Sequence, residues 1–223
     1  MRSILTGILL CAVSLSAAAS EFDYSHLDLA YTHTQYDFTS GSGNGYEIAG
    51  SWELGQNGFV LEAAYRHARF GDITGFPFVM LKPVSYRAGA AYHMPAGEFL
   101  DFVAHADYVS AKTTLDPGSP VISQSSTGYV LGVGLRGKVS DAFELDAAVD
   151  HGNTGFMRHG NGTCNPVSPF CASAVNWQQD GVETVLSLAG RYHFTHALGL
   201  GLEYRHSSLQ GGQEWLLSGR WKF

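Results

Sequence analysis

Beyond its first twenty residues, the sequence lacks any run of 18 consecutive apolar residues, so no helix is expected to span a membrane. Basic residues are also few: 13 lysines and arginines stand against 20 acidic residues, which argues against nucleic acid as a partner. Proline is scarce, with 7 residues, whereas glycine (27), tyrosine (11) and phenylalanine (13) are plentiful. This composition favours an all-β protein, and a length of 223 residues suits one domain.

The N-terminal segment has the layout of a signal peptide. Arg2 supplies one positive charge, residues 4–15 form an apolar run, and residues 17–20 are small, as a cleavage site requires. The apolar run is too short for a transmembrane helix. We therefore expect a signal peptide over 1–20 and an exported domain over 21–223, which carries 12 basic and 20 acidic residues and hence a net charge of −8.

Only three cysteines are present, and one of them lies in the expected signal peptide. Leu10 is bulky where a lipoprotein signal before Cys11 needs a small residue, so plain secretion is favoured over lipidation. The two remaining cysteines, Cys164 and Cys171, would reach an oxidising compartment. A local disulfide between them is therefore favoured over a metal site.

Two-residue alternation of apolar and polar side chains recurs ten times and is typical of strands with one apolar and one polar face. The segments are 26–32, 46–54, 59–66, 84–93, 100–108, 129–138, 143–150, 182–194, 198–205 and 214–223. Short turns, at 56–57, 95–98, 140–142 and 195–197, alternate with long polar or Gly/Pro-rich loops, at 35–44, 69–82, 111–126, 153–180 and 207–212. This alternation is that of an outer-membrane barrel with short periplasmic turns and long external loops. We predict an all-β, transmembrane antiparallel up-and-down barrel of ten strands, with eight as the alternative.

The charges are sorted by strand face. The polar faces hold 12 acidic and 8 basic residues, and the apolar faces hold none. A lipid-facing surface excludes Lys and Arg at a cost of about 2–4 kcal/mol at the midplane, whereas edge strands of a soluble sandwich tolerate them. The acidic positions are Asp28, Glu47, Glu53, Glu62, Asp101, Asp107, Glu144, Asp146, Asp150, Glu183, Glu203 and Glu214, and the basic ones are Arg66, Arg87, Arg136, Lys138, Arg191, Arg205, Arg220 and Lys222.

Aromatic residues of the apolar faces gather at the two strand ends, which predicts the two girdles of a bilayer-spanning barrel. The expected periplasmic girdle is Trp52, Phe59, Tyr92, Phe102, Phe143, Tyr192, Phe194, Trp221 and Phe223, and the external girdle is Tyr31, Tyr46, Tyr65, Tyr86, Tyr108, Tyr129, Tyr204 and Trp215.

The last expected strand, 214–223, has apolar residues at every second position and ends in Phe223. It is similar to the C-terminal signal that outer-membrane barrels present to the barrel-assembly machinery, with Trp221 and Phe223 as its aromatic positions. Together with the glycine-rich segment 129–137, it resembles the small porin-family outer-membrane proteins of Gram-negative bacteria, nearest in layout to small ten-stranded proteins of xanthomonads. The resemblance implies the cell outer membrane as location, with membrane lipid, lipopolysaccharide and the assembly machinery as partners of a monomer. It implies no cofactor and no shared activity.

One local string resembles an enzyme site. His206 and Ser208, with Glu214 nearby, are similar to the His-x-Ser pair and Glu of outer-membrane lipid A 3-O-deacylases, in which a base activates a serine. Leu209 stands where that family has Asn, and Glu214 comes early and has inward parity. Alternatively, His206 and Ser208 are ordinary polar residues at a strand end that leads into a loop. We therefore predict no enzymatic activity and keep the deacylase-like hydrolase as the alternative function.

The histidines fall into two sets. His33, His67, His151 and His206 have outward parity at external strand ends, which suits either contact with lipopolysaccharide phosphates or an ordinary polar interface. The lumen histidines, at positions 26, 93, 105 and 193, lie at different heights, so no metal site is predicted.

The lumen is the remaining candidate site. A barrel of about eight strands is filled by side chains, and ten lies near this limit. Small lumen residues such as Gly89 and Gly132 leave room for a narrow passage, so we expect either a structural role or a small pore with external loops contacting the exterior. Cross-strand ion pairs should line it. We expect Glu47 opposite Arg66, Arg87 opposite Asp107, His93 opposite Asp101, Arg136 opposite Asp146 and Lys138 opposite Glu144.

Overall fold

The computed structural model describes residues 22–35, 42–55, 57–71, 80–116, 122–152, 182–208 and 212–223. The expected signal peptide, Cys164 and Cys171 lie outside these ranges, so both expectations stay predictions. Among the described residues there is no helix long and apolar enough to cross a membrane. The strands are β1 (His26–Gln35), β2 (Ser42–Glu53), β3 (Phe59–Phe70), β4 (Met80–Gly97), β5 (Leu100–Asp116), β6 (Ile122–Ser140), β7 (Phe143–Gly152), β8 (Glu183–His193), β9 (Leu198–Ser207) and β10 (Gln213–Lys222).

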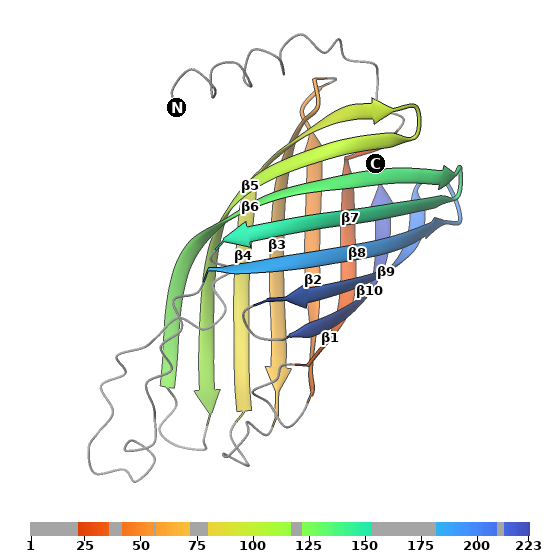
Figure 1. Cartoon of the computed structure of the whole chain (residues 1–223). Helices are drawn as coiled ribbons and strands as arrows, with labels where there is room; N and C mark the ends of the chain where they lie inside the picture. Colours follow the sequence, from red (N-terminus) through yellow and green to blue (C-terminus); the bar gives the residue numbers. More distant parts are fainter. Residues whose placement is uncertain are drawn as a thin grey trace, which may run out of the picture.

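These ten strands form one closed antiparallel barrel in which each strand pairs with its neighbours in sequence (Figure 1). The first and last strands close the wall over ten residue pairs, from His26 opposite Lys222 to Gln35 opposite Gln213. The prediction of an up-and-down barrel with ten strands is confirmed. Closure leaves no unpaired sheet edge along this seam, as a strand in hydrocarbon requires.

The two faces of the wall differ as the alternation predicts. Outward side chains are large and apolar, and Leu29 and Trp52 are 61% and 63% exposed. Inward side chains include charged residues that are nearly inaccessible, such as Asp101 at 1% and Arg136 at 4%. A soluble protein would bury the first set and expose the second. The inversion fits a wall that faces lipid.

Strands β4, β5 and β6 contain 18, 17 and 19 residues, whereas the other strands contain 10–12. They reach further at the external end than β7 to β10 (Figure 1). The expected loops at 69–82 and 111–126 are wrong in part, because strand continues from Met80 and through Asp116, and begins again at Ile122. We call this part of β4–β6 beyond the external girdle the tall wall.

The tall wall was missed because the two faces exchange their polarity there. Inward-facing Leu81, Val109 and Ala111 are 1–5% exposed, while Lys112 and Ser125 are exposed on the outward face. Beyond the hydrocarbon the outside of the barrel faces water, so outward side chains can be polar, while apolar side chains such as these three are buried inside. Strand ends predicted from an apolar outward face therefore fall too early in β4, β5 and β6.

The hairpin registers agree with expectation at two turns and differ at the third. Glu47 lies opposite Arg66 in β2–β3, and Arg136 lies opposite Asp146 in β6–β7. In β4–β5, however, Tyr92 pairs with Ala104 instead of Phe102, a shift of two residues. Strand β4 runs on to Gly97, with an irregularity between Pro95 and Gly97, so the turn is tighter and lies later than expected. Arg87 and His93 therefore lie opposite Val109 and Val103, and not opposite Asp107 and Asp101.

Candidate functional site: the charged lumen

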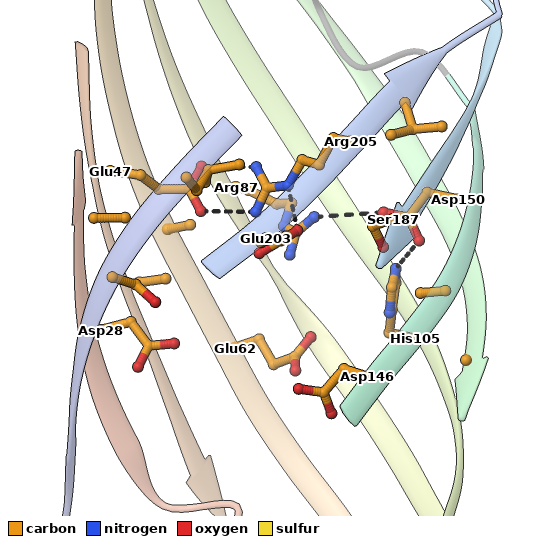
Figure 2. Close-up of a pocket in the computed structure, with 18 of the residues that line it drawn as sticks. Asp28, Glu47, Glu62, Arg87, His105, Asp146, Asp150, Ser187, Glu203 and Arg205 are labelled. Carbon is orange, nitrogen blue, oxygen red and sulfur yellow. Dashed lines mark hydrogen bonds and ion pairs between the residues drawn. The ribbon is translucent and has the colours of Figure 1, made fainter. Parts of the chain in front are cut away.

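Two arginines, Arg205 and Arg66, make most of the ion pairs in the external half of the lumen. Arg205 of β9 makes ion pairs with Glu203 at 2.5 Å and with Glu47 of β2 at 3.1 Å across the lumen (Figure 2). Arg66 of β3 pairs with Glu214 of β10, whose second oxygen lies 3.8 Å from Arg205. Glu47 and Arg66, although opposite one another in register, thus each use a different principal partner. These contacts tie β2, β3, β9 and β10 together across the barrel.

In the middle of the lumen, Arg87 of β4 lies 3.4 Å from Asp107 and 4.0 Å from Asp150. Asp150 in turn contacts His105 at 3.2 Å (Figure 2). The diagonal Arg87–Asp107 pair forms despite the shifted register, because side chains two residues apart on adjacent strands stay within reach. A methyl group at Gly132 would collide with the His105 and Asp150 side chains. This glycine therefore makes room for the His105–Asp150 ion pair.

The periplasmic half is built around Glu144 of β7. Its oxygens lie 2.7 Å from Arg136, 2.9 Å from Lys222, 3.1 Å from His193 and 3.6 Å from Arg191. Asp146 receives Arg191 at 3.0 Å and Arg136 at 3.7 Å. Charge-assisted contacts of this kind are the strong ones in a poorly hydrated interior.

Two further ion pairs complete the periplasmic end. Lys138 lies opposite Glu144 in register but contacts the exposed turn residue Asp141 at 3.5 Å. Across the closing seam, Arg220 donates two hydrogen bonds to Asp28, at 2.6 and 2.7 Å. The seam is therefore fastened by side chains as well as by backbone pairing.

The N-terminal segment 22–25 packs against lumen side chains at the periplasmic end, a feature that the sequence analysis missed. The Tyr24 ring stacks on His93 at 3.9 Å, and its hydroxyl donates a hydrogen bond to Asp101 at 2.9 Å. The guanidinium of Arg136 lies 5.0 Å from the Phe22 ring centroid and 4.8 Å from that of Tyr24, which are cation–π distances. Ser51 donates a hydrogen bond to the Tyr24 carbonyl. We call residues 22–25 the plug; only the aromatic pair just before β1 could have signalled it.

A cavity of about 390 Å³ remains in the lumen, lined by residues from Tyr24 at the periplasmic end to Gly212 at the external end. Glu62 points into this space below Arg87 (Figure 2). Among the acidic lumen side chains that the structure describes, Glu62 makes neither a hydrogen bond nor an ion pair. The cavity is thus polar and has one carboxylate without a direct partner.

The serine–histidine constellation is not assembled. Glu214 faces the lumen and pairs with Arg66, whereas His206 is on the outward parity of β9. The Ser208 hydroxyl accepts a hydrogen bond from the Thr184 backbone at 3.0 Å. The three candidate catalytic residues therefore do not form a triad, because Glu214 lies on the other side of the wall from His206.

The outward histidines have neighbours on adjacent strands. His33 contacts the Asn44 amide at 2.8 Å, His151 contacts the Thr184 hydroxyl at 3.0 Å, and His67 stacks on Tyr46 at 5.4 Å. The lumen histidines His93, His105 and His193 instead contact carboxylates. Within the described ranges, no group of three or more metal-binding side chains is arranged to hold a metal ion.

The C-terminal aromatics lie at the periplasmic rim. Phe223 makes edge contacts with Trp221 and Trp52, with ring centroids 6.3 and 6.2 Å apart. Its backbone nitrogen donates to the carbonyl of Ser25, next to the start of β1. The expected assembly signal therefore lies beside the seam that closes the barrel.

Residues 3–168 match the family model described as outer membrane protein beta-barrel domain. The chain belongs to this family. The outer-membrane barrel is similar in fold to the outer membrane channel from Pseudomonas putida F1, with 10% identity, coverage of 94% of this chain and 98% of that chain, and a TM-score of 0.50. It is also similar to the autotransporter NalP translocator domain from Neisseria meningitidis (12% identity, coverage 100% and 96%, TM-score 0.47) and to Neisserial surface protein A (15%, 89% and 95%, 0.43). No curated protein sequence matches the barrel. The protein is located in the outer membrane, and its similarity to small porin-family barrels is confirmed.

Proposed function

We propose that this protein is a monomeric structural barrel of the outer membrane whose lumen is closed at the periplasmic mouth and whose external end faces the cell exterior. The observation that carries the proposal is the plug, held by His93, Asp101, Arg136 and Ser51. Four lumen residues from four strands hold one short segment, so many contacts would have to break together before ions could pass.

The ion pairs of the lumen support the same proposal. Glu144 alone joins side chains of β6, β8 and β10. Each buried charge that loses its partner costs several kcal/mol, about 3–5 in measured cases. A lumen built in this way stabilises a fixed wall and resists hydration.

Planar-bilayer recording tests the proposal. The native barrel should show no steady conductance, and a variant with Phe22→Ser and Tyr24→Ser should show small, frequent openings. Tyr86→Ser, which removes an outward-facing tyrosine, is the matched control and should stay silent. Steady conductance of the native protein at the level of the plug variant would overturn the closed-barrel proposal.

A narrow pore is the second candidate, favoured by the cavity of about 390 Å³ and by Glu62, which lines it. Twelve lumen acids against eight bases give such a pore a mild preference for cations. Reversal potentials across a potassium chloride gradient test the sign, and Glu62→Gln should weaken the preference. Anion selectivity would contradict the assignment of the charges to the lumen.

A further inference from the structure

Three basic side chains gather on the outward face of the barrel. Arg69, Lys82 and Lys112 lie at the external ends of β3, β4 and β5, and Arg69 and Lys112 are exposed. The other described lysines and arginines have inward parity and make ion pairs in the lumen or at its rim. The outward cations are therefore not scattered around the barrel. We call these three residues the basic patch.

The register brings the patch residues together. Phe70 pairs with Leu81 and His67 with Val84, so the same register places Arg69 opposite Lys82. Lys112 pairs with Val84 and is therefore diagonal to Lys82. Opposite side chains on neighbouring strands are about 5 Å apart at Cβ, and diagonal ones about 7–8 Å apart. Side chains at these separations are close enough for one anionic group to contact two of them.

No acidic side chain that the structure describes shares this face. Asp28, Glu47, Glu62 and the other described strand acids have inward parity. Within the described part of the wall, the outward face around the patch is therefore basic.

Directly on the membrane side of the patch lies a row of tyrosines. Tyr46, Tyr65 and Tyr86 follow one another across β2–β4, with ring centroids 5.9 and 5.1 Å apart, and Tyr108 continues the row on β5. Tyr86 and Tyr108 are 57% and 58% exposed. Tyrosine of an aromatic girdle lies at the level of the lipid headgroups. The basic patch therefore lies on the external side of the girdle, with each patch residue four positions along its strand from a girdle tyrosine.

We propose that the basic patch binds the phosphate groups of a phosphorylated glycolipid of the outer leaflet, whose acyl chains lie along the wall beneath the tyrosine row. Such a lipid has its anionic head on the external side and its apolar tails on the membrane side. The wall has the basic patch on the external side and the tyrosine row on the membrane side. A soluble polyanion would need only the cations and not the apolar wall beside them. The inference rests on the outer-membrane location and not on whether the lumen conducts.

The test uses the folded full-length barrel in lipid nanodiscs that contain bis-phosphorylated lipid A, with dephosphorylated lipid A as the comparison probe. Replacing all three patch residues, Arg69→Gln, Lys82→Gln and Lys112→Gln, should weaken retention of the phosphorylated lipid, measured by native mass spectrometry, about a hundredfold. The figure follows from about 1 kcal/mol for each basic side chain at an anionic surface and 1.4 kcal/mol for each factor of ten. Retention of the dephosphorylated lipid should not change.

A second triple variant, His33→Gln, His151→Gln and His206→Gln, changes outward side chains elsewhere on the external rim and should bind as the native barrel does. Replacing Lys82 and Lys112 by Arg should preserve binding, since charge is kept. Should the triple patch variant fail to assemble, Arg69→Gln and Lys112→Gln are measured singly, each with about a fivefold loss expected.

Three results would overturn the proposal: equal retention of the two lipids, loss of binding in the histidine variant alone, or stronger patch-dependent binding of dextran sulfate in detergent than of phosphorylated lipid A. The last result would assign the patch to a soluble polyanion. None of these outcomes depends on conductance, so they are separate from the test of the closed barrel.

Discussion

Glu144 receives four side chains within 3.6 Å, from Arg136, Arg191, His193 and Lys222. Such convergence is what a poorly hydrated lumen demands, because a buried carboxylate is costly unless its oxygens are paired and hydrogen-bonded. Arg136 has a matching role, since it binds Glu144, approaches Asp146 and lies over two rings of the plug. In the periplasmic half of the lumen, many of the ion pairs therefore involve two residues, Glu144 and Arg136.

We expect Arg136→Met to destabilise the folded barrel by less than the about 3–5 kcal/mol of a buried charge left without any partner, because Glu144 keeps Arg191, His193 and Lys222. Lys138→Met should cost under about 1 kcal/mol, since its partner Asp141 is exposed. Urea unfolding in detergent or vesicles measures both free energies.

A double-mutant cycle then identifies the partner of Arg136. Coupling should be larger with Glu144→Gln than with Asp146→Asn, as the distances of 2.7 and 3.7 Å imply. Additive effects in both cycles would mean that the guanidinium contacts neither carboxylate.

At the scale of strands, the outward side chains of the tall wall change from apolar to polar where the surroundings change from lipid to water. Along β6, outward Leu131 and Tyr129 face the membrane region, and outward Thr127 and Ser125 follow beyond the girdle. The side chains keep one face throughout, because successive odd-numbered residues of a strand point the same way. The change from apolar to hydroxyl side chains therefore marks the level at which lipid gives way to water.

This boundary can be measured by thiol labelling of intact cells, in a parent variant with Cys164→Ser and Cys171→Ser. Ser125→Cys should react with a membrane-impermeant maleimide, whereas Leu131→Cys, about 20 Å further along the strand, should be protected by lipid. Glu98→Cys, in the β4–β5 turn, should react only after the outer membrane is broken. Labelling of Leu131→Cys at the rate of Ser125→Cys would place the membrane boundary elsewhere.

At the scale of the whole molecule, closure joins the two ends of the chain. The β1–β10 seam combines ten backbone pairs with the Asp28–Arg220 ion pair and the Thr34–Glu214 hydrogen bond. Phe223 adds a backbone hydrogen bond to Ser25 and ring contacts at the rim. Strand β10 therefore completes the barrel by pairing with β1.

We expect deletion of Phe223 to reduce the amount of assembled barrel in the outer membrane without blocking export to the periplasm. Assembly is followed by the difference in gel migration between boiled and unboiled samples of outer-membrane fractions. Phe194→Ala removes another exposed girdle aromatic, 63% accessible, and should assemble nearly normally. Equal heat-modifiable bands for the native and deleted chains would show that the terminal aromatic is dispensable.

The sequence by itself determined the closed ten-stranded barrel and the face on which each lumen charge lies. These follow from local rules, since a side-chain period of two and a lipid face that rejects charge leave a distinct pattern in single segments. Only the tertiary structure decided the main partners of several charges: Glu47 pairs with Arg205 and Arg66 with Glu214, across strands far apart in the chain.

The tertiary structure also decided the two-residue shift of β4 against β5, the tall wall and the plug. Parity allows a slip of two residues, so alternation cannot fix the register. The plug residues Phe22 and Tyr24 carry no periodic signal, because their place is set by a mouth that exists only after all ten strands have closed around it.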